Sequence, residues 1–354
     1  MENTGMTLEQ FLNDWNNNRS VIEVHTSGST GVPKKIFVEK QRMISSAMMT
    51  CSYLNLSSTD TALLCMPLDY IAGKMMVIRS LVCGMKLISV NPSSHPLSNL
   101  TESPSFAAMV PMQVYCSLQV EHERKLLMGI KNLLIGGGAV DKKLSEVLKS
   151  FPNAVWSTYG MTETLSHIAL RRLSGSDASD YYTPFSNISV SLNDKSCLCI
   201  EAPNLCQQVL VTNDVAEFSE TDSRQFRILG RIDNVIDSGG IKIQIEDIEE
   251  AIHDKLDIEF AITKQPDEKF GETIAILIKF DNLPDNAFTD KHEYEEDCPI
   301  SKKVMQIKDT LMHILPKYWI PRQYYVCSRI PHTGTGKIAR KEVYEMVTNL
   351  SPII

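Results

Sequence analysis

A polar stretch near the start of the chain has the residue types of an anion-binding loop. Residues 25–34 read HTSGSTGVPK, in which two glycines can adopt positive φ and let backbone N–H groups point towards a ligand, while hydroxyls and a lysine add donors. Taken alone the stretch is a weak signal, because it does not match the GxxxxGK[ST] P-loop and because Ser/Thr/Gly turns before a proline are ordinary loops. The donors predicted for a polyphosphate are Thr26, Ser27, Gly28, Ser29, Thr30, Gly31 and Lys34.

Five further motifs strengthen this interpretation. They are GGGAV at 136–140, YGMTE at 159–163, TNDVAEF at 212–218, GRIDNVIDSGG at 230–240 and TGTGKIAR at 333–340. Together with TSGSTGVPK they resemble, in the same order, the adenylate-forming superfamily of acyl-CoA synthetases, adenylation domains and luciferases. The resemblance runs from about residue 25 to residue 345. Each motif is weak by itself, but the ordered set is highly specific.

The resemblance implies a reaction in two steps that uses ATP, Mg²⁺ and CoA. A substrate carboxylate attacks the α-phosphorus of ATP to give an acyl-adenylate and pyrophosphate, and a thiol then displaces AMP to give a thioester. The carboxylate has a reference pKa near ~4, so it needs no general base at neutral pH. Two unit charges about 4 Å apart repel by roughly 4 kcal/mol at an effective dielectric of ~20. The site must therefore supply positive charge and oriented dipoles.

Three residues match the implied catalytic positions. Lys337 resembles the lysine that bridges the attacking carboxylate and the α-phosphate region, although a lysine in a Gly-rich loop is more often a solvated surface residue. Glu163 resembles the magnesium ligand, which suits a metal that prefers hard oxygens and few protein ligands. A glutamate here would also suit the N-terminus of a helix. Thr162 resembles a hydrogen-bond donor to the α-phosphate.

The other nucleotide contacts are implied by the same resemblance. We expect Tyr159 to stack on adenine, and Gly137 and Gly138 to let the ring approach the backbone closely. We expect Asp214 to accept hydrogen bonds from both ribose hydroxyls and Arg231 to reach the ribose.

Three positions are implied to serve domain movement and CoA. Asp233 matches the hinge about which the small domain swings between the two steps, although an aspartate here also suits a simple turn. Gly239 and Gly240 resemble the loop that approaches the pantetheine in the second step. Asn213 departs from the family, which usually has glycine before the ribose-binding aspartate. Asparagine tolerates a left-handed backbone, so we expect the turn to persist.

Residues 66–79, MPLDYIAGKMMVIR, resemble the acid-pocket stretch of the o-succinylbenzoate–CoA ligases of menaquinone biosynthesis. The implied acid-binding residues are Tyr70, Gly73 and Arg79. Succinylbenzoate carries two carboxylates, and arginine is a natural bidentate partner for the one that is not activated. The apolar flank MMVIRSLVCG argues against a freely solvated arginine on a helix surface. Tyr70 and Ala72 replace the family's usual histidine and serine.

Two other functions remain open. Asp69 resembles the aspartate that holds the substrate ammonium in amino-acid-activating domains, which favours an enzyme that adenylates an amino acid or another small acid for a carrier-protein thiol. Arg79 argues against this function, because an ammonium gains nothing from a nearby cation. The other alternative is an inactive nucleotide-binding paralogue, and the retention of the implied catalytic and nucleotide residues argues against it.

Hydrophobic patterning, together with the resemblance, predicts an α/β fold with a truncated adenylate-forming domain. A large AMP-binding domain of layered sheets and helices is expected over 1–230, and a small, mobile α+β domain that carries the catalytic lysine over 231–354. Short apolar runs alternate with amphipathic segments up to about residue 185, which favours a mostly parallel sheet. The expected helices include 71–83, 111–119 and 141–149.

Composition and charge limit the partners. The net charge of −8 does not favour nucleic acid. The apolar runs are interrupted by charges and are too short for a membrane span, and no secretory signal pattern is present, so we expect a cytoplasmic protein. The nine cysteines are then expected to be reduced thiols, with Cys197 and Cys199 as strand residues rather than zinc ligands.

The predicted phosphate loop begins only about two dozen residues from the first residue, whereas family members place it much deeper in the chain. We expect the large domain to lack part of its usual N-terminal segment and to expose an apolar face that a second copy covers in a homodimer. The acidic stretch 281–299 is expected to form a surface loop.

Overall fold

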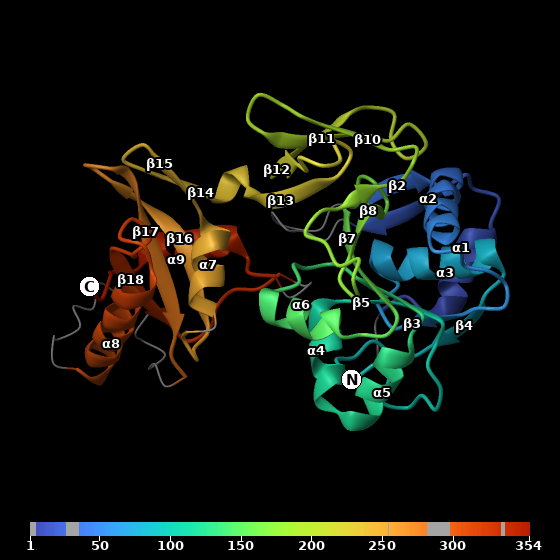
Figure 1. The fold of residues 1–354 in the computed structure, drawn as a ribbon, viewed down its shortest axis with the longest axis horizontal. Helices are drawn as coiled ribbons and strands as arrows, with labels where there is room; N and C mark the ends of the chain where they lie inside the picture. The colour runs from blue at the N-terminus through green and yellow to red at the C-terminus, as the bar shows by residue number, and fades with distance from the viewer. Residues whose placement is uncertain (1–4, 26–34, 254, 282–297, 334–336) are drawn as a thin grey trace. The chain divides into compact units, whose positions relative to one another are not determined.

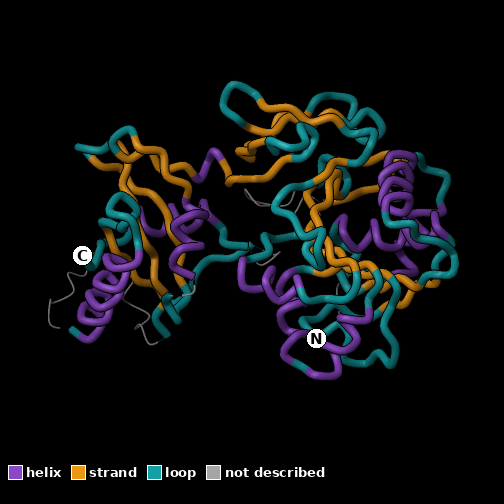
Figure 2. Tube along the Cα trace, in the orientation of Figure 1, coloured by secondary structure: helices purple, strands orange, loops and turns teal. Residues whose placement is uncertain are grey.

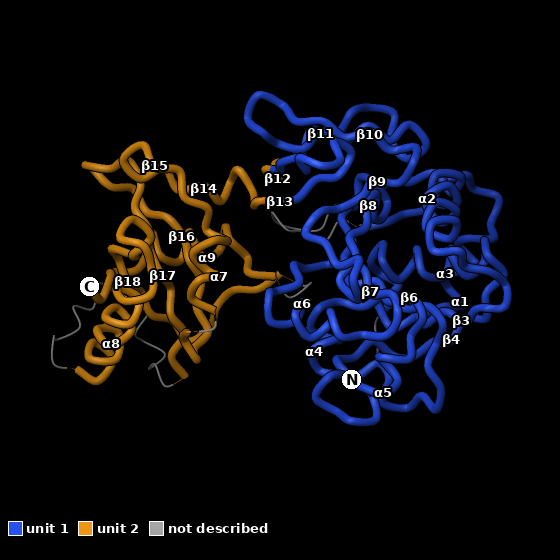
Figure 3. The backbone as a smooth tube through the Cα atoms, viewed as in Figure 1, with its two compact units in different colours: residues 1–28, 32–212, 216–228 blue, residues 29–31, 213–215, 229–354 orange. Residues whose placement is uncertain are grey.

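The computed structural model describes residues 5–25, 35–253, 255–281, 298–333 and 337–354. Its contacts divide the chain into two compact units, which Figure 3 colours separately. Unit 1 comprises residues 1–28, 32–212 and 216–228, and unit 2 comprises residues 29–31, 213–215 and 229–354. The predicted phosphate loop at 26–34 and most of the predicted acidic loop, residues 282–297, lie outside the described residues.

Unit 1 is built on a sheet that is parallel over most of its strands. In the described part of the chain this sheet has seven strands in the order β4-β3-β5-β6-β7-β8-β9 (Figure 1). The strands from β4 to β7 pair in parallel, and β8 and β9 are added antiparallel. The strands are β3 (Thr61–Leu64), β4 (Lys86–Ser89), β5 (Phe106–Met109), β6 (Asn132–Ile135), β7 (Ala154–Gly160), β8 (His167–Arg172) and β9 (Thr183–Pro184). The predicted α/β fold with a mostly parallel sheet is confirmed.

Helices cover both faces of this sheet (Figure 2). Alternate residues of β3 enter two different apolar clusters, Ala62 and Leu64 the first and Leu63 the second, as the two-residue period of a strand requires. The first cluster also receives side chains from α1 (Leu8–Asn16), α2 (Lys40–Tyr53) and α3 (Ile71–Cys83). The second receives side chains from α4 (Pro111–Gln119), α5 (Glu121–Gly129) and α6 (Lys142–Lys149).

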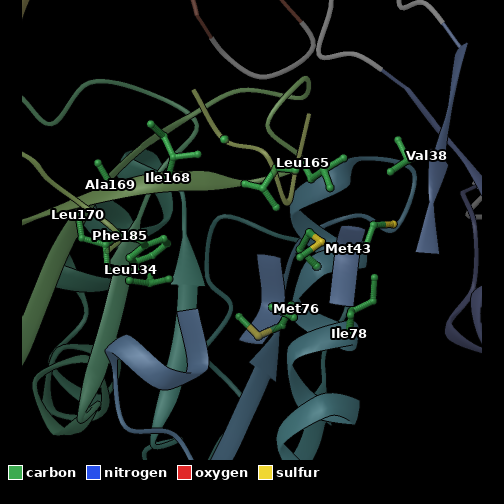
Figure 4. Close-up of a cluster of buried hydrophobic side chains, with 14 of the residues drawn as sticks. Val38, Met43, Met76, Ile78, Leu134, Leu165, Ile168, Ala169, Leu170 and Phe185 are labelled. Atoms are coloured by element: carbon green, nitrogen blue, oxygen red, sulfur yellow. The ribbon is translucent and has the colours of Figure 1, made fainter. Parts of the chain in front are cut away.

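Helix α3 is buried along most of its length. Every residue from Gly73 to Ser80 is buried, including the cations Lys74 and Arg79. Figure 4 shows Met76 and Ile78 of this helix in the first apolar cluster, together with Met43 of α2. A helix that is buried on all sides lies inside the core rather than on its surface.

Two further groups of strands belong largely to unit 1. Strands β1 (Val21–His25) and β2 (Lys35–Glu39) pair antiparallel on either side of the predicted phosphate loop. A second sheet has the order β10-β11-β12-β13, and residues 213–215 of β12 and the end of β13 belong to unit 2. Its strands are β10 (Ser189–Leu192), β11 (Cys197–Glu201), β12 (Leu210–Phe218) and β13 (Phe226–Arg231). Cys197 and Cys199 lie buried in β11, so their interpretation as strand residues is confirmed.

Unit 2 is a smaller α+β body. Its described sheet has the order β15-β14-β17-β16, with β18 parallel to β17. Alternate residues of β17 enter two clusters, one shared with α7 and α8 and the other with α9. The elements are β14 (Val235–Ser238), β15 (Ile241–Gln244), α7 (Ile245–His253), β16 (Phe260–Asp267), β17 (Gly271–Lys279), α8 (Pro299–Ile314), β18 (Gln323–Cys327) and α9 (Arg340–Asn349), with a short 3₁₀ turn at Ile232–Asn234.

The helices with a strong apolar pattern were predictable, and those with a weak pattern were not. Helices α3 and α4 span the predicted residues, and α6 begins one residue later than expected. The structure adds α2, α5 and α9, which were not predicted. Helix α9 shows the reason, because Val343 and Val347 are its only fully buried residues and leave too short an apolar stripe to stand out.

The expectation of reduced thiols is wrong for one pair of cysteines. Cys51 in α2 and Cys83 in α3 form a disulfide across 32 residues of sequence. The tertiary contact between the two helices brings these residues together, and neither local sequence signals it. The other described cysteines form no disulfide, namely Cys65, Cys116, Cys197, Cys199, Cys206, Cys298 and Cys327.

We expect Gly73→Ala to destabilise unit 1, although alanine is the better helix former. Helix propensity alone would stabilise α3 by about 1 kcal/mol. A Cβ atom at residue 73 would, however, lie 2.3 Å from the carbonyl oxygen of Pro67, and relieving that contact costs roughly 1–3 kcal/mol. Ala72→Gly, at the exposed neighbouring position, should follow propensity and lose about 1 kcal/mol. Thermal unfolding measures both variants, and a more stable Gly73→Ala protein would contradict the close packing.

Candidate active site

The turn between β7 and β8 carries Thr162 and Glu163. Thr162 is buried and Glu163 is exposed. The hydroxyl of the buried Thr164 accepts a hydrogen bond from the Met161 N–H at 3.0 Å and lies 2.7 Å from the carbonyl oxygen of Ser166. Residues 162–166 therefore form a turn, and the interpretation of Glu163 as the N-terminal residue of a helix is wrong. Glu163 instead projects from a turn that the side chain of Thr164 closes.

Two backbone features fix the exit of this turn. Leu165 has a φ of 66°, which is costly for a residue with a branched side chain, and its side chain is buried in the first apolar cluster (Figure 4). A Cβ atom on Gly160 would come within 2.3 Å of the Ser166 carbonyl oxygen and 2.5 Å of the His167 Cα. The glycine of the YGMTE motif is therefore required by the close approach of β7 and β8, where the strand register shifts.

The predicted adenine residues lie at the ends of neighbouring strands. The ring of Tyr159 packs against those of Tyr182 and Phe226, with centroid distances of 5.8 and 5.3 Å. The glycines at 136–138 follow β6, and a Cβ atom on the first of them would meet the Thr158 hydroxyl at 2.4 Å. Gly137 has a φ of 78°, which favours glycine. The glycine run thus packs against the strand that presents Tyr159.

Arg79 is a buried cation whose charge no described acidic side chain balances. It is 2% exposed, and its Nε atom has no hydrogen-bond partner among the described residues. Removal from water lowers the pKa of Arg79 to about 9, so the side chain remains charged at neutral pH. Burying an unpaired charge is costly, and an anionic ligand would relieve that cost. The burial also excludes the interpretation of Arg79 as an arginine on a solvated helix face.

A chain of hydrogen bonds holds one side of the guanidinium. The Nη2 group of Arg79 donates to Ser166 Oγ at 2.6 Å, and Ser166 Oγ lies 3.3 Å from His167 Nδ1. His167 Nε2 lies 2.9 Å from Thr50 Oγ1. Burial, and secondarily the positive charge of Arg79, hold the pKa of His167 well below its usual value, so the imidazole is neutral at neutral pH. These contacts join α3, the exit of the β7–β8 turn and α2.

The other predicted acid-binding residues lie at the start of α3. Tyr70 is the residue that precedes the helix and is half-buried. Gly73 packs against the carbonyl oxygen of Pro67, as described above. These contacts hold the segment before α3 against its first turn, while Arg79 lies further along the helix.

Asp69 and Lys74 have partners within the protein. Both carboxylate oxygens of Asp69 accept from the N–H of Met6, at 3.2 and 3.3 Å. Lys74 Nζ donates to the carbonyl oxygen of Glu23 at 2.7 Å. Burial lowers the pKa of Lys74, and the nearby Asp69 carboxylate opposes this shift. Asp69 therefore secures the segment before α1.

Unit 2 brings the predicted ribose-binding residues together with the predicted hinge residue. Arg231 donates from Nη1 to Asp214 Oδ1 at 3.3 Å and from Nη2 to Asp233 Oδ2 at 3.0 Å. The side-chain amide of Asn213 donates to the same oxygen of Asp233 at 2.9 Å. The asparagine that replaces the family's usual glycine is thus bonded to the predicted hinge.

Lys337 is exposed, yet the surrounding protein partly desolvates its amino group. This desolvation lowers the pKa of Lys337; the charge of Asp214 opposes the shift and that of Arg231 adds to it. The backbone N–H of Lys337 donates to Thr333 Oγ1 at 3.2 Å, and the N–H of Thr333 donates to the Lys337 carbonyl at 2.7 Å. Lys337 therefore lies in the electrostatic field of the predicted ribose-binding residues.

Arg340 anchors the segment that follows Lys337. Its Nη1 and Nη2 groups donate to the two carboxylate oxygens of Glu249 in α7, at 2.6 and 2.5 Å. Nη1 also donates to the carbonyl oxygen of Ile262 in β16 at 3.1 Å. A bidentate pair of this kind fixes orientation as well as position.

The two glycines of the predicted CoA loop form the turn between β14 and β15. Gly239 and Gly240 have φ angles of 63° and 85° and connect Ser238 to Ile241, which pair across the hairpin. A two-residue turn with positive φ at both positions favours glycine. The hairpin turn is thus sufficient to explain why both positions are glycine.

Sequence reasoning missed several residues that position the site, namely Thr50, Thr164, Ser166, His167 and Glu249. Thr50 and His167 are 117 residues apart, so no local pattern links them. The one indication of these residues in the sequence was Arg79 itself, because an arginine inside an apolar helix needs polar partners from elsewhere in the fold.

The described residues contain no cluster of three or more histidine, cysteine or acidic side chains that could hold a metal ion. A single exposed carboxylate such as Glu163 fits Mg²⁺, which takes most of its ligands from phosphate and water. In the same part of the chain, no helix is long and apolar enough to cross a membrane.

The match to a family model defines the class of protein. Residues 12–201, more than half of the chain, match the AMP-binding enzyme family, so the chain belongs to this family. It is 24% identical to a 2-succinylbenzoate–CoA ligase of Listeria monocytogenes, over 95% of this chain and 72% of that protein.

Solved structures share the fold. An acyl-CoA synthetase (AMP-forming)/AMP-acid ligase II-like protein from Dyadobacter fermentans is 29% identical with a TM-score of 0.60, over 95% of this chain and 92% of that chain. The o-succinylbenzoate CoA synthetase of Bacillus subtilis, solved with its acyl-adenylate intermediate, is 20% identical with a TM-score of 0.71, over 91% of this chain and 68% of that chain.

We expect the reactivity of Lys337 towards an amine-modifying reagent to follow the charges beside it. Asp214→Asn removes a group that raises the pKa of Lys337, so labelling should begin at lower pH; Arg231→Gln should shift it to higher pH. Peptide mass spectrometry across a pH series measures the labelled fraction, with the exposed Lys341 as internal control. Identical profiles for the three proteins would contradict the electrostatic coupling.

Proposed function

We propose that this protein is an AMP-forming acid–CoA ligase that converts o-succinylbenzoate, ATP and CoA into o-succinylbenzoyl-CoA, AMP and pyrophosphate through an acyl-adenylate. Arg79 carries the substrate assignment, because it is a buried cation that no described acidic side chain balances. The names of the relatives support the same acid and its place in menaquinone biosynthesis.

In the first step, unit 2 supplies charge to the nucleotide. Asp214 accepts from the ribose hydroxyls while Arg231 holds its carboxylate in place. Lys337 brings positive charge to the α-phosphate and the attacking carboxylate, where repulsion between anions must be offset. Thr162 donates to the α-phosphate, Tyr159 stacks on adenine, and residues 26–34 hold the outer phosphates. Mg²⁺, held by Glu163, neutralises part of the phosphate charge when bound.

The acid is oriented by its second carboxylate. We place that group against Arg79, whose Nη2 group donates to Ser166 and whose Nε atom has no hydrogen-bond partner among the described residues. A charge-assisted hydrogen bond contributes more binding free energy in a buried site than in water, so a diacid should bind more tightly than a monoacid. The carboxylate at the other end of the acid then reaches the α-phosphorus.

The structure makes the amino-acid alternative weaker. Both oxygens of Asp69 are engaged by the backbone N–H of Met6, so this carboxylate is occupied within the protein. The buried cations Lys74 and Arg79 lie on the helix that follows, which disfavours an ammonium substrate. The thiol acceptor is proposed to be CoA, approached by Gly239 and Gly240 in the second step.

We further propose that the protein works in the cytoplasm and that its C-terminal part, from about Arg231, moves about Asp233 between the two steps. Exposed apolar side chains on β2, α2 and α3, among them Phe37, Met48 and Leu81, support the proposed homodimer.

We expect Lys337→Ala to lower the rate of ATP–pyrophosphate exchange by roughly 100-fold, because one electrostatic contact to the transition state is typically worth that much. Lys341→Ala removes an exposed lysine from the first turn of α9 and is the matched control, expected to keep the full rate. Unchanged exchange in Lys337→Ala would mean that this lysine does not act in adenylation.

We expect Arg79→Gln to raise the KM for o-succinylbenzoate by roughly 10- to 100-fold, the usual value of a hydrogen-bonded charge pair, with little change in the KM for ATP. Benzoylpropionate, which lacks the aromatic carboxylate, tests the cause. The wild-type preference for the diacid over this monoacid should disappear in the variant. A preference that survives, or an equal effect on ATP, would contradict the assigned role of Arg79.

A further inference from the structure

Four side chains from three separate segments form one continuous chain of hydrogen bonds at the proposed acid site. Arg79 contacts Ser166 at 2.6 Å, Ser166 contacts His167 at 3.3 Å, and His167 contacts Thr50 at 2.9 Å. Arg79, His167 and Thr50 are buried and Ser166 is partly buried, so these groups depend on one another more than on solvent.

The direction of these hydrogen bonds follows from the arginine. A guanidinium can only donate, so Ser166 Oγ must accept from Arg79 Nη2. The single hydroxyl proton of Ser166 is then available for His167 Nδ1, its other described side-chain partner. His167 Nδ1 can accept that proton only if it carries none itself.

The Thr50 end of this series of hydrogen bonds favours the same protonation of His167. The hydroxyl of Thr50 donates its one proton to the carbonyl oxygen of Ser46 in the preceding turn of α2, at 3.3 Å. With that bond made, Thr50 Oγ1 accepts from His167 Nε2, which then carries a proton. The neutral imidazole with its proton on Nε2 satisfies both ends together.

A charged imidazole would break the chain. With protons on both nitrogens, His167 could no longer accept the Ser166 proton and would place a second buried cation near Arg79. Burial and the charge of Arg79 disfavour that form, which agrees with the low pKa of His167. The neutral ring is thus consistent with both the electrostatics and the hydrogen bonds.

The backbone holds Ser166 and His167 where the chain of hydrogen bonds needs them. The left-handed Leu165 precedes them, and the hydroxyl of Thr164 lies 2.7 Å from the Ser166 carbonyl oxygen. Gly160 lies so close that no side chain fits between it and these residues. The same turn carries Thr162 and Glu163, so the proposed phosphate and acid contacts share one rigid segment.

We propose that His167 is a positioning residue for Arg79, in a relay of hydrogen bonds; this proposal rests on the proposed function. The Nε2–H tautomer of His167 accepts from Ser166 and donates to Thr50. The Ser166 hydroxyl then turns a lone pair towards Arg79, which orients the guanidinium for the second carboxylate of a diacid. The relay makes His167 a determinant of diacid specificity, although it does not itself touch the acid.

The tautomer is tested without any substrate. Ring ¹⁵N chemical shifts of histidine-labelled protein, with the His167 signals assigned by their loss in His167→Asn, should show a protonated Nε2 and an unprotonated Nδ1. A proton on Nδ1, or an imidazolium at neutral pH, overturns the relay whatever acid the enzyme uses.

Two substitutions separate the two sides of the ring. His167→Asn places an amide oxygen near the position of Nδ1 and keeps an acceptor for Ser166, whereas His167→Gln keeps the donor to Thr50 and loses that acceptor. We expect His167→Gln to raise the KM for o-succinylbenzoate by roughly 3- to 10-fold, the range for one neutral hydrogen bond. The KM values for ATP and benzoylpropionate should not change, and His167→Asn should restore most of the diacid affinity.

A double-mutant cycle with Arg79→Gln completes the test, because a residue that acts only through Arg79 has no effect once Arg79 is gone. His167→Gln should therefore leave the diacid KM of the Arg79→Gln protein unchanged. An equal effect in both backgrounds, or equal effects of the Asn and Gln variants, overturns the positioning role. If the wild-type enzyme turns over no diacid, the proposed function fails, and the ¹⁵N result still decides whether the relay exists.

Discussion

The burial of Arg79 without an acidic partner among the described residues is the constraint around which unit 1 is arranged. Removing a guanidinium from water costs several kcal/mol, even after the protein relaxes. Ser166 offsets part of this cost, and Nε is left without a partner among the described residues. This unbalanced charge is the feature on which the proposed recognition of a substrate carboxylate rests.

In unit 2, by contrast, Arg231 has acidic partners within the protein. Arg231 lies between Asp214 and Asp233, and its charge is satisfied before any ligand arrives. In the proposed function this arginine orients the carboxylate that receives the ribose hydroxyls, and it does not need an anion of its own. The environment of Lys337 is intermediate between those of Arg79 and Arg231. Its side chain is exposed, but its amino group is partly desolvated and interacts with charges of both signs. The three cations thus differ in their surroundings, and the different roles proposed for them follow from that difference.

The segment from Tyr159 to His167 links these functions within unit 1. It carries the proposed adenine, phosphate and magnesium contacts and then, through a left-handed Leu165, the two residues that hold Arg79. A single turn therefore joins the proposed nucleotide contacts to the proposed acid contact, and in the proposed reaction the two substrates meet at one phosphorus. This coupling depends on Gly160, since any side chain there would push the two strands apart.

The amino-acid sequence was sufficient for the family, the α/β class and the helices that are rich in apolar residues, such as α3 and α4, because these depend on local pattern and on ordered motifs. It also indicated that Arg79 is not solvated, from the apolar residues on either side. It gave no sign of the disulfide between Cys51 and Cys83 or of the contact between Thr50 and His167, because these join residues far apart in the chain. The tertiary structure alone decides which polar groups meet the buried arginine, since only the packing of α2, α3 and the β7–β8 turn brings them within hydrogen-bonding distance.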